Sequence, residues 1–152
     1  MQFGGGIMSR TTNGFDFSEL TRYQRKMLQL AEEKMPKESK KFLRKEGTKL
    51  RKKTLSTAKS KVKKKTGNYF KGIKRGKVYK YGANGALSIR VYGASPHAHL
   101  IEYGHRQVTE DGREVGFIEG QHVFRDAQNE FQNEFFNDAR KFIDELIDKG
   151  LR

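Results

Sequence analysis

Cysteine is absent from the 152 residues of this sequence, so neither a disulfide nor a thiolate metal site can form within it. No run of apolar residues approaches the length of about 18 that a membrane-spanning helix needs. The beginning of the chain also lacks a basic segment followed by an apolar stretch, and we therefore expect no signal peptide there. These absences are compatible with synthesis in the cytoplasm.

Apolar residues are scarce as well. They make up 34% of the chain, against 33% for charged residues, and so fall below the roughly 45–50% of an average globular protein. A chain of this length is expected to form one domain, but its surface must be large relative to its core. This composition favours a protein that gains part of its buried area from neighbouring subunits.

Positive charge, by contrast, is abundant and concentrated in one segment. The net charge of the chain is +14. Residues 37–80 carry 19 basic and 2 acidic residues, a local charge of +17, so the rest of the chain carries −3. This asymmetry is typical of a surface that meets polyanions or acidic protein partners.

The N-terminal half is expected to consist of an arm followed by helices. Residues 1–17 have a run of glycines and no hydrophobic periodicity, which predicts a flexible arm, and residues 18–152 are expected to form a single α+β assembly domain. Apolar residues at three- and four-residue spacing predict a helix over 18–34. Pro36 suits the first turn of a second, strongly basic helix.

Two glycines punctuate this second helix. Gly47 is its weak point, since glycine costs about 1 kcal/mol relative to alanine in a helix, and is a candidate for a break or bend. The step Thr66-Gly67-Asn68 is expected to end the helix, because glycine and asparagine accept the left-handed conformation that closes helices.

Beyond this step the hydrophobic period changes from helical to alternating. Residues 77–81 and 86–92 flank a glycine and asparagine turn and predict an antiparallel hairpin, with Leu87, Ile89 and Val91 facing the core. Ser95-Pro96 is expected to open a short helix that runs to Gly104. Residues 106–118 predict a second hairpin, which turns at Asp111-Gly112.

The last predicted element is a long helix between Gly120 and Gly150. Helical spacing predicts that its apolar face supplies much of the core, through Phe124, Ala127, Phe131, Phe135, Phe142 and Leu146. Its carboxylates are expected on a solvated face: Asp126, Glu130, Glu134 and Asp138. The predicted fold class is therefore α+β, a small antiparallel sheet of two hairpins packed by long N-terminal and C-terminal helices, with a short helix between the hairpins.

The sequence offers little for catalysis or metal binding. His97 and His99 would point about 200° apart on a helix and could not chelate one ion there. No activated serine context and no glycine-rich phosphate loop is present. We therefore expect no enzyme, no metal and no cofactor.

The basic segment is a candidate for contact with DNA or with an acidic partner. Its candidate contact residues are Lys61, Lys63, Lys64, Lys65, Lys71, Lys74 and Arg75. They could neutralise several phosphates, with Tyr69 and Phe70 available for stacking. The alternative is a solvated helix face, and a run of charge alone does not separate the two.

Three short signatures give the chain a resemblance to a known family. They are Thr66-Gly67-Asn68 after a basic helix, residues 98–104 (AHLIEYG), and residues 122–127 (HVFRDA) at the start of the terminal helix. With these the chain resembles the tail-completion and head-to-tail joining family of phage neck proteins, also found in prophage-derived contractile tails. The family tends to have a proline in the third signature, where this chain has Arg125 and Asp126.

The resemblance implies an α+β subunit that forms a ring, commonly of six copies, in the neck or tail of a virion or phage-tail-like particle. Glu102, Tyr103, Gly104, Phe124 and Ala127 would serve as motif or assembly residues, and no catalytic residue or cofactor is implied. The implied partners are tail tube or terminator proteins, portal-side connector proteins and possible genomic DNA in the lumen, with no membrane. The alternative function is a stand-alone, sequence-independent nucleic-acid-binding protein that uses residues 37–80.

Overall fold

The computed structural model describes residues 18–63 and 67–151. The arm predicted at residues 1–17 lies outside these ranges. The described chain divides into two compact units. One unit runs up to Ser39 and resumes at Ala139, and the other unit consists of Lys40–Asp138. Each unit is described by itself below.

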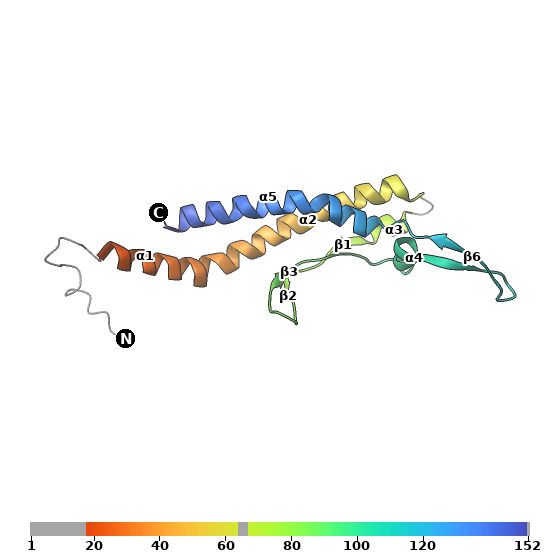
Figure 1. Ribbon diagram of the computed structural model, residues 1–152, viewed down its shortest axis with the longest axis horizontal. Helices are drawn as coiled ribbons and strands as arrows, with labels where there is room; N and C mark the ends of the chain where they lie inside the picture. Colours follow the sequence, from red (N-terminus) through yellow and green to blue (C-terminus); the bar gives the residue numbers. More distant parts are fainter. Residues whose placement is uncertain (1–17, 64–66, 152) are drawn as a thin grey trace. The chain divides into compact units, whose positions relative to one another are not determined.

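The predicted α+β class is confirmed (Figure 1). The helices are α1 Ser18–Gln29, the π-helical turn η1 Leu30–Lys34, α2 Met35–Lys61, α3 Asn68–Lys71, α4 Ala98–Tyr103 and α5 Val123–Leu151. The strands are β1 Ile73–Arg75, β2 Tyr79–Lys80, β3 Leu87–Ser88, β4 Val91–Gly93, β5 Gly104–Val108 and β6 Glu114–Glu119. All strand pairs are antiparallel, and each forms its own two-stranded ladder.

The boundary predicted between the first two helices, just before Pro36, is a widened helical turn. The π-helical η1 joins α1 to α2 directly, and Met35 donates its N–H to the carbonyl of Leu30. Pro36 has no N–H to donate and its ring crowds the preceding turn, so an ordinary α-helical turn is disfavoured at this place. A π-helical turn is one of the recognised ways in which a helix accommodates such a residue.

Two expectations for the basic helix were wrong. Helix α2 runs through Gly47 without a break, and Gly47 is buried. A Cβ atom at this position would lie 2.8 Å from Ile89 Cδ1, so the glycine is explained by the close approach of the first hairpin. The helix also ends at Lys61, before the step at residues 66–68. Gly67 does adopt the predicted left-handed conformation, with φ +81°, but it precedes α3.

The first predicted hairpin is confirmed and is longer than expected. β1 pairs with β4 and β2 pairs with β3, and Gly76 donates its N–H to the carbonyl of Arg90 between the two ladders. The register shifts by one residue between the ladders, since Arg75 pairs with Val91 while Tyr79 pairs with Ser88. This hairpin is anchored to α2 by Arg51 Nε, which donates to the Ile73 carbonyl at 2.9 Å.

The core of the Lys40–Asp138 unit lies where α2, the first hairpin and α5 meet. Ala58, Ile73 and Val123 are fully buried there, and Leu55, Val62, Tyr69, Phe70, Val91 and Phe124 pack around them. Val91 therefore contacts this core as predicted. Leu87 and Ile89 are only half-buried. In α5, the predicted core residues Ala127 and Phe131 are buried, while Phe124 and Phe135 are half-buried.

The other unit is helical and has a small core. Leu30 and Leu146 are buried, and Gly150 lies so close to Leu30 that a Cβ atom on the glycine would meet three atoms of the leucine side chain. Apolar side chains remain exposed on both parts of this unit, including Met27 and Leu28 from α1 and Ile143 and Ile147 from α5. In the part of the chain that the structure describes, no helix is long and apolar enough to cross a membrane.

Candidate assembly surfaces

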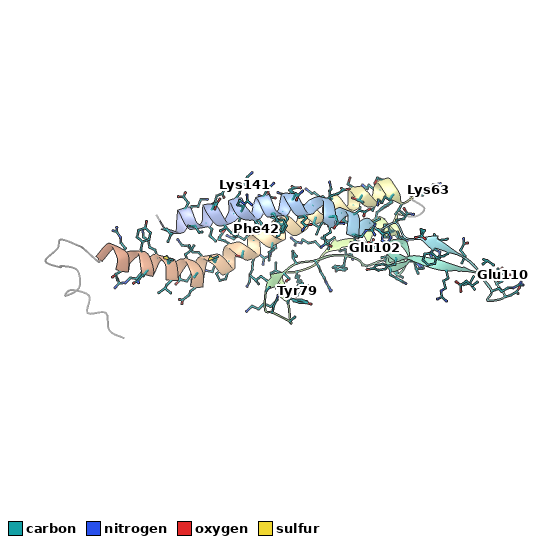
Figure 2. All side chains as sticks on the ribbon, viewed as in Figure 1. Phe42, Lys63, Tyr79, Glu102, Glu110 and Lys141 are labelled. Atoms are coloured by element: carbon teal, nitrogen blue, oxygen red, sulfur yellow. The ribbon has the colours of Figure 1, made fainter. Side chains whose placement is uncertain are left out.

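The corner between α4, the second hairpin and α5 is built around Glu102 (Figure 2). This side chain is buried, with 7% of its surface exposed. Its two carboxylate oxygens accept the N–H groups of Phe124 at 2.9 Å and Arg125 at 3.1 Å. These N–H groups belong to the first turn of α5 and have no partner within the helix, and a negative charge is favourable at a helix N-terminus. Glu102 therefore caps α5.

Two glycines let the backbone pass closely at this corner. Gly104 has φ +85°, and a Cβ atom on it would overlap the carbonyl oxygen of Ile118. A Cβ atom on Gly120 would overlap the backbone of Glu102 and Tyr103. Two hydrogen bonds follow from this approach: Gln121 donates to the Ile101 carbonyl at 2.7 Å, and His122 to the Glu102 carbonyl at 3.3 Å. The structure thus gives a structural reason for Glu102 and Gly104, whereas Tyr103 is 72% exposed.

The third signature lies at the beginning of α5, as predicted. Val123 and Ala127 are fully buried, and Phe124 packs against the core around Ile73. Nearby, the hydroxyl of Tyr69 is buried without a hydrogen-bond partner. Burial, and then the negative charge of Glu102, raise the pKa of Tyr69 to about 12. This phenol therefore stays neutral beside the capping carboxylate.

The carboxylates of α5 form only part of the solvated face that the sequence predicts: Glu130 and Glu134 are exposed, whereas Asp126 and Asp138 are half-buried. Figure 1 shows α2 and α5 lying along each other within the Lys40–Asp138 unit, and ion pairs connect them. Lys49 pairs with Asp138 at 2.6 Å and Lys53 with Glu130 at 3.2 Å. Lys61 pairs with Asp126 and donates a hydrogen bond that lowers the pKa of this carboxyl group. Part of the positive charge of α2 is therefore matched within the same chain.

The predicted DNA or partner contacts fall into three groups. Lys61 is engaged with Asp126 and with the Gln121 carbonyl. Arg75 donates to the Arg44 carbonyl at 3.0 Å and to Thr48 Oγ1 at 3.3 Å, so it holds the first hairpin on α2. Lys63, Lys71 and Lys74 are exposed. Lys64 and Lys65 lie outside the described residues.

The second hairpin is confirmed, with β5 and β6 paired from Gly104↔Glu119 to Val108↔Glu114. Its turn contains Gly112, as predicted, with φ +78°. Its apolar side chains are open to solvent: the exposed fractions are 57% for Val108, 63% for Val115 and 55% for Phe117. Single exposed apolar residues are ordinary, but several on one small element mark an interaction surface.

A groove lies between α2, the first hairpin and α5, and we call it the Glu46 groove. It has a volume of about 420 Å³, and its walls include Leu43 and Leu50 from α2, Leu87 and Ile89 from the hairpin, and Phe135 and Phe136 from α5. Glu46 lies in its lining with 3% of its surface exposed, and its Oε2 atom has no hydrogen-bond partner. Burial, and after it the hydrogen bond and charge of Asp138, raise the pKa of Glu46 to about 7, although Lys49 lowers it.

The sequence contained a signal for this groove that the prediction missed. Glu46 follows Leu43 by three residues and precedes Leu50 by four, so the three side chains share one face of the helix. A carboxylate on the apolar stripe of a basic helix is a candidate for burial. The neighbouring Gly47 supports the same prediction, because a glycine leaves room for another element at this face.

The histidines do not form a metal site in the described part of the chain. His97 and His99 are exposed and sit around the start of α4, whose first residue is Ala98. Ser95 lies before this helix and His97 takes the cap position, so the helix begins at Ala98, later than the predicted opening at Ser95-Pro96. Among the described residues, no group of three or more histidines and carboxylates is placed to hold a metal ion.

Comparison with known families adds one finding. The family model of bacteriophage HK97 gp10, described as a proposed tail component, matches residues 22–104, which is more than half of the chain. This range includes the signatures at 66–68 and 98–104 and ends before the signature at 122–127. Neither the curated proteins nor the solved structures that were compared include a match.

Proposed function

Because the chain belongs to the bacteriophage HK97 gp10-like family of tail components, we propose that it is a structural neck protein. It forms a ring that completes the tail and joins it to the connector on the portal side. Its work is surface complementarity with copies of itself and with neighbouring particle proteins, without catalysis. In a particle it would reside in the neck, after synthesis in the host cytoplasm.

The observation that carries this proposal is incomplete burial. Among the described residues, 8 apolar side chains are buried while 15 large ones are exposed, so much apolar surface is left for other chains to cover. The exposed side chains lie on both units, from Tyr23 in α1 to Ile147 in α5. A ring gives every copy two neighbours and can cover such surfaces in each of them.

Particle assembly in the absence of this protein tests the proposal. We expect heads and tails that accumulate separately, and rings of the purified protein in negative-stain electron microscopy or native mass spectrometry. Adding the purified protein to the separate heads and tails should restore joined particles. Fully joined, infectious particles in its absence would overturn the proposal, as would a strictly monomeric protein both alone and with tail and connector proteins.

The alternative function, a stand-alone nucleic-acid-binding protein, has fewer basic side chains available than the sequence suggests, because several lysines of α2 form ion pairs within the chain. Lys49, Lys53 and Lys61 are paired with carboxylates of α5, while Lys63, Lys71 and Lys74 stay exposed. We propose that these exposed lysines meet DNA in the lumen of the ring or an acidic neighbour. Either contact needs only a few charges.

A salt titration separates this proposal from the alternative. We expect the isolated protein to bind duplex DNA weakly, and replacing Lys63, Lys71 and Lys74 with glutamine to leave ring formation unchanged. Each phosphate contact contributes about −0.9 to the slope of log K against log salt, so three contacts give a slope of about −3. Submicromolar binding near 150 mM salt with a much steeper slope would favour the stand-alone nucleic-acid-binding protein.

A further inference from the structure

The β5–β6 hairpin presents an apolar face that the described residues of its own unit leave exposed. Arg106 pairs with Phe117 across the two strands, and alternation along each strand places Val108 and Val115 on the same side as this pair. The register shift between Gln107 and Val108 brings Glu114 to this side as well, where it pairs with Arg106 at 3.6 Å. We call Arg106, Val108, Val115 and Phe117 the hairpin face.

This hairpin is a two-stranded ribbon. Its strands contact each other and α4, and Figure 2 shows the hairpin extending away from α4 to Glu110. A two-stranded ribbon is marginally stable in water unless another element packs on one of its faces. More than half of the surface of each apolar side chain on the hairpin face is exposed. The hairpin face therefore needs a partner.

The Glu46 groove has the complementary composition. Its walls are mainly apolar, and Phe136 is 55% exposed there. The buried Glu46 has one oxygen without a hydrogen-bond partner, and its nearest cation, Lys49, lies 3.6 Å from the other oxygen and is bonded to Asp138. A buried polar atom without a hydrogen-bond partner destabilises the structure that contains it, so the groove favours an apolar occupant that also brings a cationic donor.

We propose that the Glu46 groove of one copy receives the hairpin face of a second copy, with Phe117 and Val108 between its apolar walls and Arg106 donating to Glu46. Arg106 is available for this contact, because its pair with Glu114 is long and its side chain is 73% exposed. Such exposed pairs contribute little. An arginine is also suited to a carboxylate, since its guanidinium offers several donors in one plane.

The two surfaces differ, so the contact is head-to-tail. A head-to-tail contact leaves one free hairpin and one free groove on every pair, and repetition with a suitable rotation closes a ring. The inference therefore rests on the proposed ring and names the surfaces that would form it.

Mixing two defective chains tests the head-to-tail arrangement. Phe117→Asp removes the hairpin face and Phe136→Asp removes the groove wall, and both side chains are more than half exposed, so folding should persist. Each variant alone should need at least about tenfold more protein to form rings. Mixed together, they should form pairs that stop short of a ring, because one intact hairpin meets one intact groove. Ile118→Asp, on the opposite face of the same strand, is the matched control and should assemble normally.

Single cysteines give direct evidence, because the chain has none of its own. A mixture of Val108→Cys and Phe136→Cys chains should form a disulfide between chains, while Gln107→Cys, on the opposite face, should not link to Phe136→Cys. Links among Val108→Cys chains alone would overturn the proposal in favour of hairpin-to-hairpin pairing. A link from Phe136→Cys to Ile7→Cys in place of Val108→Cys would assign the groove to the N-terminal arm instead.

The outcomes distinguish this inference from the function that it deepens. Rings or joined particles in which Val108→Cys and Phe136→Cys never link would overturn the docking proposal and leave the neck function standing. Joined particles formed without the protein would instead overturn the proposed neck function itself. Full-length chains are used throughout, with far-ultraviolet circular dichroism as the check on folding.

Discussion

Replacing Gly104 with alanine is expected to lower the free energy of unfolding by about 3 kcal/mol, as measured by denaturant titration. Two costs add at this position. Gly104 has φ +85° and ψ 176°, a backbone region that is essentially restricted to glycine and costs residues with a Cβ atom about 1–3 kcal/mol. The new Cβ atom would also overlap the carbonyl oxygen of Ile118, and such crowding typically costs about 1–3 kcal/mol.

Three other glycines separate these two costs. Gly112 also has a positive φ, +78°, and open space where a Cβ atom would lie, so Gly112→Ala should show the cost of a positive φ without a steric overlap. Gly120 lies close to the backbone of Glu102 and Tyr103 but carries no positive φ, so Gly120→Ala should show the steric cost alone. Gly82 has neither feature, and Gly82→Ala should change stability by less than about 1 kcal/mol. A loss for Gly104→Ala as small as that for Gly82→Ala would contradict the two costs assigned to this corner.

Local patterns in the sequence predicted most of the secondary structure. Alternating side chains around glycine turns located both hairpins, and helical spacing located α1 and α5. These elements are specified by neighbouring residues, so a short window of sequence contains the information. The end of α2 at Lys61 was missed, because nothing local distinguishes Lys61 from the lysines that follow it.

Contacts between distant segments could not be predicted in the same way. The carboxylates of α5 look like a solvated face in the sequence, yet Asp126, Glu130 and Asp138 pair with lysines 65, 77 and 89 positions earlier. The local sequence around a charged residue does not show whether its side chain faces water or a distant lysine. The role of Gly47 was mispredicted for a related reason. The glycine leaves room for the side chain of Ile89, which belongs to another element.

The corner residues were found only through the family resemblance. The pattern around residues 98–104 singled out Glu102 and Gly104 as motif or assembly residues but did not predict the contacts that they make. The structure supplies the reasons: Glu102 caps α5 through two N–H groups, and Gly104 allows a close backbone crossing. Tyr103 has no comparable contact in the described chain and is largely exposed, so its assembly role stays a prediction.

Glu46→Gln is expected to stabilise the unassembled protein at high pH. The pKa of Glu46 is about 7 in the folded chain, against 4.5 for an ordinary glutamate, so the folded state holds its proton more tightly. Stability conferred by the protonated carboxyl is complete below about pH 4.5 and is lost as the pH rises towards 7. The shift corresponds to about 3 kcal/mol at most, and glutamine stays neutral throughout. We expect Glu46→Gln to match the wild type near pH 5 and to exceed it by about 2 kcal/mol at pH 8.

The measurement uses denaturant titrations at both pH values on the Phe117→Asp background, at protein concentrations below those at which this variant forms rings. Glu134→Gln is the control, because Glu134 also lies near Lys49 but is 56% exposed, and it should change little at either pH. An equal effect of Glu46→Gln at pH 5 and pH 8 would contradict the burial of an ionising carboxyl. On the assembling chain the sign should reverse: with Arg106 of a neighbour beside it, the charged Glu46 is the favoured form, and Glu46→Gln should weaken the ring. If Glu46 is a buried carboxyl that binds a cation of the neighbouring copy, Glu46→Gln should therefore stabilise the single subunit and destabilise its assembly.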